Sequence, residues 1–154
     1  MISSYASEKL LLTLWVGGLW AIGFLAVPMA FANLGDVALA GNYAGQLFSA
    51  INLLGLGCGS VLVFTKLIQH KLKVKQLWRF WLLLLMVVMT LVFSLYLQPE
   101  IAALKQLDWQ AEQSLVERFS FLHELSKNLY LLLSLFGLAL VLSTDKQIQL
   151  LKAS

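Results

Sequence analysis

The sequence predicts an all-α integral membrane protein, an up-and-down bundle of four helices with a short amphipathic outer helix before the fourth span. The first observation behind this prediction is composition. Of the 154 residues, 60% are hydrophobic and 12% are charged, whereas soluble domains average about 45–50% apolar and about 25% charged residues. The second is that the apolar residues gather into four runs with no linker-like stretch between them. Residues 1–154 are therefore expected to form a single transmembrane domain.

The first three apolar runs cover about residues 10–34, 45–68 and 78–99. Each has the roughly 20 residues that a helix needs to cross about 30 Å of hydrocarbon. Pro28 lacks a backbone donor and is expected to bend the outer end of the first span. A cleaved signal peptide is the alternative for this run, since Ala-Phe-Ala at 30–32 resembles a cleavage site. The run is longer than the usual apolar region of about 7–15 residues, however, so a span is favoured.

The fourth span is expected to begin in a polar segment. Its uninterrupted apolar part, from Leu129 to Ser143, has only 15 residues and falls short of the hydrocarbon thickness. The span must therefore cover about 119–143 and carry ionisable side chains into the outer half of the membrane. Upstream of it, apolar residues at helical spacing predict the amphipathic outer helix: Ile101, Leu104, Leu107, Ala111 and Leu115.

The connecting segments predict the orientation. The segment between the second and third spans carries five bases and no acid: Lys66, Lys71, Lys73, Lys75 and Arg79. By the positive-inside rule this loop is cytoplasmic, which places both termini in the cytoplasm. The predicted location is the bacterial inner membrane. Because membrane orientation explains the net charge of +3, no nucleic-acid partner is predicted.

The fourth span divides into a polar and an apolar side. At about 100° per residue, one sector contains Ser120, His123, Lys127, Tyr130, Ser134 and Gly137. The opposite sector contains Phe121, Leu122, Leu125, Leu129, Leu132 and Phe136. Ionisable groups within a membrane usually face other helices, so the polar sector is expected to face inward. Snorkelling of Lys127 to the headgroups is the purely structural alternative.

The candidate binding residues come from this polar sector, from its neighbours and from the second span: His123, Glu124, Lys127, Asn128, Tyr130, Ser134 and Asn52. The candidate packing residues are small or helix-bending: Gly17, Gly45, Gly55, Gly59 and Pro28. Among them, Gly55 and Gly59 have the GxxxG spacing that permits close helix approach.

No motif predicts an enzyme, a metal site or a cofactor. The sequence contains no Walker loop, HExxH or nucleophile motif, and its single cysteine, Cys58, excludes an internal disulfide. A haem held by two histidines is disfavoured, because His70 and His123 are expected at opposite sides of the membrane. Thioether and thiol groups that could bind copper are expected to pack in the apolar core instead: Met29, Cys58, Met86 and Met89.

Several short stretches carry a family resemblance: LWVGGLWAIGFLAVPMAFA, AGNYAGQLFSAIN, YLQPEI and FSFLHELSKNL. With them the chain resembles the transmembrane protein 205-like family, whose bacterial members carry the domain of unknown function 4149. The resemblance implies a small polytopic membrane protein. Association of a eukaryotic member with resistance to a platinum drug implies handling of solutes or soft metals. The positions that the resemblance marks are Pro28, Gly45, Phe48, Pro99, His123, Ser126 and Asn128.

Three functional hypotheses follow. The leading one is a non-enzymatic protein that binds or helps to move a small solute or ion through the outer half of the fourth helix. The second is an accessory or assembly subunit that docks a larger membrane protein complex. The third, a quinone or haem oxidoreductase, requires the absorbance of a cofactor in the purified protein. Expected partners are the lipid bilayer and either a membrane protein or a second copy of the chain.

Overall fold

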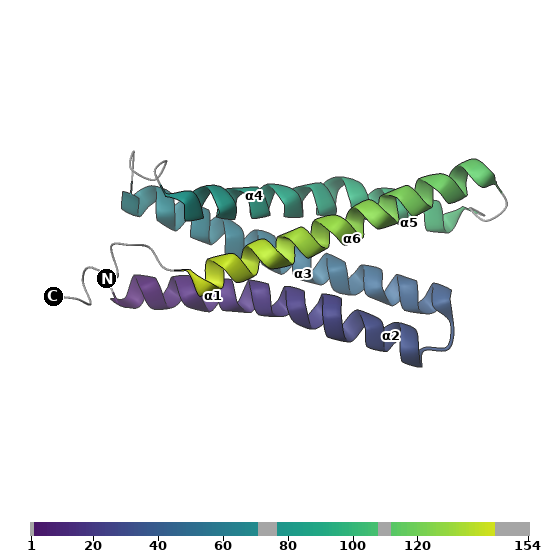
Figure 1. Cartoon of the computed structure of the whole chain (residues 1–154), viewed down its shortest axis with the longest axis horizontal. Helices are drawn as coiled ribbons and strands as arrows, with labels where there is room; N and C mark the ends of the chain where they lie inside the picture. The colour runs from purple at the N-terminus through teal and green to yellow at the C-terminus, as the bar shows by residue number, and fades with distance from the viewer. Residues whose placement is uncertain (1, 71–76, 108–111, 144–154) are drawn as a thin grey trace.

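The protein is built from four long helical segments that run alternately up and down (Figure 1). The computed structural model describes residues 2–70, 77–107 and 112–143. The first segment comprises α1 (Ile2–Ala21), the π-helical segment η1 (Ile22–Ala26) and α2 (Val27–Asn33). The second is α3 (Val37–His70). The third comprises α4 (Trp78–Val92), the π-helical segment η3 (Phe93–Leu97) and α5 (Gln98–Gln106), and the fourth is α6 (Gln113–Leu142).

All four segments are long and apolar enough to cross a membrane. The candidate spans are Ala6–Asn33, Val37–Gln69, Trp78–Gln106 and Gln113–Leu142. The described residues contain no strand. The predicted fold class, an all-α membrane bundle, is therefore confirmed, and the chain is a multi-pass membrane protein.

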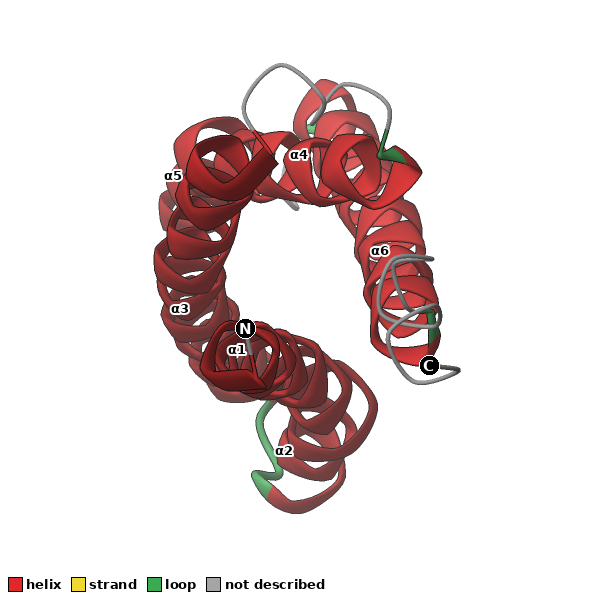
Figure 2. Ribbon diagram, turned by 90° about the vertical axis from the view of Figure 1, so that its left-hand side faces the viewer, coloured by secondary structure: helices red, strands yellow, loops and turns green. Residues whose placement is uncertain are grey.

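The helices form a ring in which each contacts two neighbours. Helix α3 lies between α1 and α4, and α6 closes the ring by packing on both α1 and α4 (Figure 2). The start of α1 and the end of α6 lie at one end of the bundle, which we call the terminal end (Figure 1). The α2–α3 turn, the end of α5 and the start of α6 lie at the opposite end, which we call the far end (Figure 1). A single apolar core runs through the ring, with Trp15, Leu19, Met86, Leu97 and Leu133 among its most buried side chains.

The turn between α2 and α3 is shorter than the sequence suggested. Helix α3 begins at Val37, whereas the apolar run predicted a start near residue 45. Two residues explain the early start. Gly35 has a φ of 68°, which glycine adopts without strain, and the Asp36 carboxylate accepts hydrogen bonds from the backbone of Ala38 at 2.7 Å and Leu39 at 3.2 Å. Asp36 thus caps the first free donors of α3.

The two prolines interrupt α-helical geometry without ending a helix. In η1 the backbone N–H of Val27 donates to Ile22 O, and in η3 that of Gln98 donates to Phe93 O. Each bond spans five residues and lies immediately before a proline, Pro28 or Pro99. A π-helical turn accommodates a residue that lacks a donor and whose ring crowds the preceding turn. The third segment consequently continues beyond residue 99, where the sequence predicted its end.

The expected amphipathic outer helix corresponds to α5, and it prolongs the third segment. Leu104 is buried in the core, whereas Leu107 is exposed beyond the end of α5. Leu115 lies on α6 and packs against the core, and Ala111 lies outside the described residues. The residues of the predicted amphipathic pattern therefore do not form one helix, because Leu104 lies on α5 and Leu115 lies on α6.

The glycines of α3 receive the indole ring of Trp15 from α1. A Cβ atom added at Gly55 would overlap the Trp15 indole, and one added at Gly59 would lie 2.5 Å from Val87 Cγ2 and 3.0 Å from Trp15 Cζ3. Trp15 is fully buried there. Gly17 and Gly45 differ, because a Cβ added at either would meet no described atom within 4 Å. The close approach at this face is thus between a glycine pair and a tryptophan.

Replacing Gly55 by alanine should destabilise the bundle. The added methyl group must displace Trp15, and overpacking of a filled core costs about 1–3 kcal/mol, which outweighs the gain of up to about 1 kcal/mol from replacing a helical glycine. Gly45→Ala is the matched control, since its methyl group meets open space and only the gain remains. Unfolding of both variants in mild detergent measures the difference. Equal stability of Gly55→Ala and Gly45→Ala would contradict the packing of Trp15 described above.

Candidate functional site

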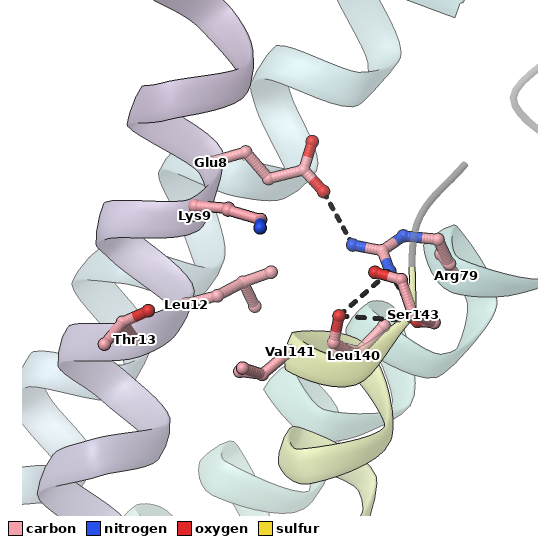
Figure 3. Close-up of a pocket in the computed structure, with 8 residues that line it drawn as sticks. All are labelled: Glu8, Lys9, Leu12, Thr13, Arg79, Leu140, Val141 and Ser143. Carbon is pink, nitrogen blue, oxygen red and sulfur yellow. Dashed lines mark hydrogen bonds and ion pairs between the residues drawn. The ribbon is translucent and has the colours of Figure 1, made fainter. Parts of the chain in front are cut away.

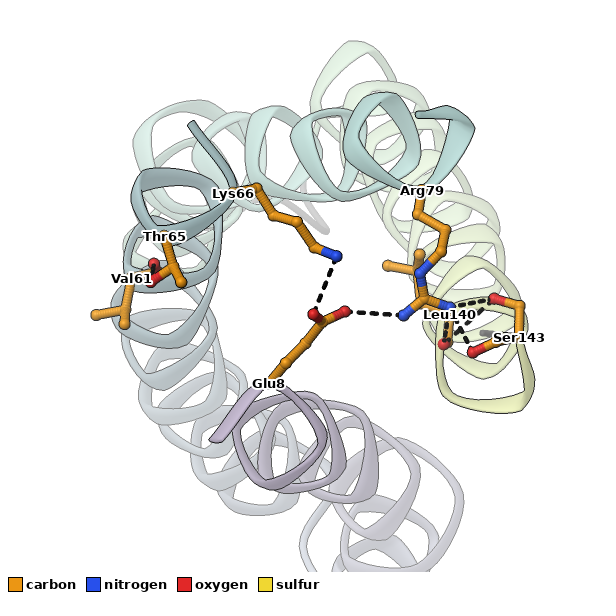
Figure 4. Close-up of polar contacts among 7 residues, drawn as sticks. All are labelled: Glu8, Val61, Thr65, Lys66, Arg79, Leu140 and Ser143. Carbon is orange, nitrogen blue, oxygen red and sulfur yellow. Dashed lines mark hydrogen bonds and ion pairs between the residues drawn. The ribbon is translucent and has the colours of Figure 1, made fainter. Parts of the chain in front are cut away.

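An ion-pair cluster joins three helices at the terminal end. Glu8 extends from α1 into the centre of the ring, where its carboxylate meets one cation from α3 and one from α4 (Figure 4). Glu8 Oε2 lies 2.9 Å from Lys66 Nζ, and Glu8 Oε1 lies 3.0 Å from a terminal guanidinium nitrogen of Arg79. One acid on the first segment thus pairs with bases on the second and third.

Arg79 extends the cluster to the fourth helix. Its other terminal nitrogen, NH1, donates to Leu140 O at 2.9 Å, to Ser143 O at 2.5 Å and to Ser143 Oγ at 2.5 Å. The last carbonyl groups of a helix have no partner within it and carry partial negative charge, so the guanidinium caps the end of α6. We call Glu8, Lys66, Arg79, Leu140 and Ser143 the terminal clamp. It contains residues from all four segments.

The charges of the terminal clamp are largely withdrawn from solvent. Lys66 is 4% exposed and Arg79 is 5% exposed, and the Glu8 side chain is 18% exposed. Charged groups removed from water need close partners, because desolvation costs several kcal/mol per ion. The sequence placed Lys66 and Arg79 in a loop that orients the protein, whereas the structure buries both within the bundle.

A pocket opens beside the clamp, between the start of α1 and the end of α6 (Figure 3). Its volume is about 110 Å³, and it is lined by Glu8, Lys9, Leu12, Thr13, Arg79, Leu140, Val141 and Ser143. A second space of about 10 Å³ lies on the α3 and α4 side of the clamp, next to Lys66 and Leu83. The larger pocket combines charged and hydroxyl groups with apolar walls.

Sequence reasoning missed the clamp for an identifiable reason. Glu8 was taken as a residue that precedes the first span, but α1 is already helical from Ile2, so Glu8 lies within the bundle. Arg79 is 71 residues away from Glu8 in sequence. The one available signal was an acid at the start of an apolar run in a chain whose bases gather at span ends.

The polar sector of α6 is covered by α1 in the half nearest the terminal end. Tyr130 donates a hydrogen bond from its hydroxyl to Leu19 O at 2.6 Å. Trp20 Nε1 donates to the carbonyl of Ser134 at 3.4 Å, and the side chain of Ser134 is fully buried. One turn further on, a Cβ added at Gly137 would lie 2.7 Å from Val16 Cγ2. These three α6 residues face inward, as the sequence predicted.

The same sector is uncovered in the other half of α6. His123 and Lys127 are exposed, and the Lys127 side chain, 58% exposed, pairs with Glu124 at 2.8 Å. In this half, α2 diverges from α6 toward the far end (Figure 1). Helix α2 packs against α3 instead. The predicted inward orientation of His123 and Lys127 is therefore wrong. We call His123, Glu124, Lys127 and Asn128 the uncovered face.

Leucines fill the inward side of α6 in this half instead. Leu122 is 2% exposed, and Leu125 and Leu129 pack against the core. All three were predicted to face lipid. In this half the inward side is therefore rotated about the helix axis relative to the polar sector. The neighbours here are η3 and α5, which also pack against α6: Phe93 lies beside Tyr130, and Glu100 pairs with Arg118.

Two asparagines of the candidate set lie in contrasting environments. Asn52 of α3 is 2% exposed, and its Nδ2 has no hydrogen-bond partner among the described residues. Asn128 belongs to the exposed part of α6. The structure therefore does not gather the predicted binding residues into one internal site. It divides them between three buried positions, Asn52, Tyr130 and Ser134, and the exposed surface of α6 that carries the other four.

Comparison with known proteins identifies the first three segments. The family profile described as "Domain of unknown function (DUF4149)" matches residues 10–109. The chain belongs to the DUF4149 family. No match was found among curated proteins or among solved structures. The likeness to transmembrane protein 205 expected from the sequence stays a prediction.

The range matched by the DUF4149 profile contains some of the candidate residues and excludes others. The matched range contains Lys66 and Arg79 of the terminal clamp, together with Pro28 and Pro99. It ends before α6, so the uncovered face lies outside it.

Neutralising Glu8 should strongly lower the stability of the folded DUF4149 protein. Glu8→Gln retains the shape of the side chain but leaves Lys66 and Arg79 buried without their carboxylate. Removal of one partner from a buried ion pair costs about 3–5 kcal/mol. The matched control is Glu100→Gln, which breaks the exposed pair with Arg118 and should change stability little. Thermal unfolding of the two purified variants tests this, and similar losses in both would contradict a stabilising clamp.

Proposed function

We propose that this DUF4149 protein is a non-enzymatic membrane protein that binds, or helps to move, a small polar solute or ion at the uncovered face of α6. One observation carries the proposal. The polar side of α6 is covered by α1 around Tyr130 and Ser134, but its continuation at His123 and Lys127 is exposed. A ligand at that surface would take the place that α1 occupies further along the helix.

The chemistry of the uncovered face suits a ligand with both donors and acceptors. Glu124 and Lys127 form a pair that offers a carboxylate and an ammonium group, and Asn128 offers an amide. The imidazole of His123 stacks on Phe119 with ring centroids 5.9 Å apart and an interplanar angle of 7°. Ionisable side chains within membrane segments are costly and commonly mark solute or ion sites.

The geometry favours a lateral surface over a channel through the ring. The two pockets described above lie at the terminal end, and neither is lined by His123 or Lys127. The centre of the bundle is filled by buried side chains such as Trp15, Met86 and Leu133. The proposed place of solute handling is therefore the outward side of α6 in the half nearer the far end.

A labelling experiment tests whether the uncovered face is open to water in the membrane. In a Cys58→Ala background, His123→Cys should react with a membrane-impermeant thiol reagent at least about tenfold faster than Phe121→Cys. Phe121 lies two residues earlier on α6 and is also exposed, but it belongs to the apolar side, so depth is matched and hydration differs. Equal rates for the two variants in membranes and in detergent would refute the proposal.

The same variants distinguish the accessory-subunit hypothesis from the solute-handling hypothesis. If a protein partner covers the face, His123→Cys should be protected in native membranes and become reactive after purification.

Native mass measurement supplies the direct test of solute binding. The wild-type protein purified in mild detergent should carry a bound small molecule, and Lys127→Ala should lose it. Protection in membranes without a bound small molecule would favour docking over solute handling.

For orientation, we propose that the terminal end faces the cytoplasm of a bacterial inner membrane. The support is the excess of bases between Lys66 and Arg79 under the positive-inside rule. A reporter that is active only in the periplasm should remain silent when fused after Ser154 and become active when inserted at Gly35, in the α2–α3 turn. The reverse pattern would show that the terminal end faces the periplasm.

A further inference from the structure

We propose that the pocket beside the terminal clamp binds a phosphate group, carried by the headgroup of an anionic phospholipid. The inference does not depend on the uncovered face, which lies in the other half of α6. It rests on the chemistry of the pocket lining, on the fixed charge of the clamp and on the apolar residues around the pocket.

The pocket lining brings an ammonium group, a hydroxyl group and a fixed guanidinium charge to one place. Lys9 extends from α1 toward the clamp, and Thr13 lies one turn further along the same helix (Figure 3). Across the pocket, Arg79 contributes positive charge, since its terminal nitrogens already bond to Glu8 and to the end of α6. The Ser143 hydroxyl also lines the pocket and donates to Leu140 O. Ammonium, guanidinium and hydroxyl donors are the groups that bind phosphate in proteins.

The clamp fixes positive charge beside this pocket. Lys66 and Arg79 contribute two positive charges and Glu8 one negative charge, and Lys9 adds a further positive charge at the pocket. Because Lys66 and Arg79 are almost fully buried, their charges are screened less by water than surface charges are. In this arrangement Arg79 is held by Glu8 and α6, and exposed Lys9 is the side chain that closes on the ligand.

The size and surroundings favour a lipid as the source of the phosphate. A volume of about 110 Å³ corresponds to a few water molecules at about 30 Å³ each, which is room for a phosphate group without a large substituent. Exposed leucines continue from the pocket along both helices: Leu10 and Leu14 on α1 and Leu142 on α6. Acyl chains can lie along these leucines while the headgroup enters the pocket.

A titration of the purified full chain tests the site. Phosphatidylglycerol added to the detergent-solubilised protein should raise the midpoint of thermal unfolding by about 3–6 °C, since a ligand that binds only the folded state stabilises it. Phosphatidylcholine, which has no net charge, should raise it much less. Inorganic phosphate forms a third arm, and an equal rise with it would assign the site to free phosphate.

Two variants connect the response to the pocket. Lys9→Gln should lose at least about half of the rise with phosphatidylglycerol, and Thr13→Val should lose a smaller part. Both residues are exposed and lie outside the clamp, so both variants should fold. Arg118→Gln removes an exposed base that pairs with Glu100 and should keep the full rise.

Specific results would overturn the proposal. One is an equal response to phosphatidylglycerol and phosphatidylcholine, and another is a full response in Lys9→Gln. A third is the absence of any rise in the midpoint of the wild type with either phosphatidylglycerol or inorganic phosphate.

Discussion

The pairing of Glu8 with Lys66 and Arg79 is the constraint on which the arrangement of the helices depends. A carboxylate placed between two buried cations stabilises the bundle only while the first three segments remain together, because each ion loses its hydration on burial. Arg79 imposes the same condition on the fourth segment by binding the end of α6. The helices therefore converge at the terminal end. No comparable clamp joins α2 to α6 among the described residues, and these two helices separate.

The number and order of the spans could be predicted because they depend on length and hydrophobicity alone. Four apolar runs fix four crossings, whatever the side chains contact. The exact ends could not be predicted from the same pattern. The start of α3 depends on a hydrogen-bonded cap at Asp36, and the continuation through Pro99 depends on a π-helical turn. Both are local backbone solutions that hydropathy does not report.

The candidate site was predictable only where it followed from one helix. The periodicity of α6 correctly grouped Tyr130, Ser134 and Gly137 on an inward face, because α1 covers that face. It could not show that the neighbour diverges near His123, since that depends on the path of another helix. The clamp was out of reach for a related reason. Its members come from separate spans, and each base by itself is typical of a loop that orients a membrane protein.

The two π-helical segments give the segments of the bundle unequal stiffness. Helices α3 and α6 are unbroken over 34 and 30 residues, whereas the first and third segments each contain a widened turn followed by a proline, where one backbone hydrogen bond is missing. Bending is therefore concentrated at η1 and η3. A change in bilayer thickness is therefore expected to be absorbed first as a change in the tilt of α2, which follows η1 and packs on α3. The width between α2 and α6 is then a property of the surrounding membrane as well as of the sequence.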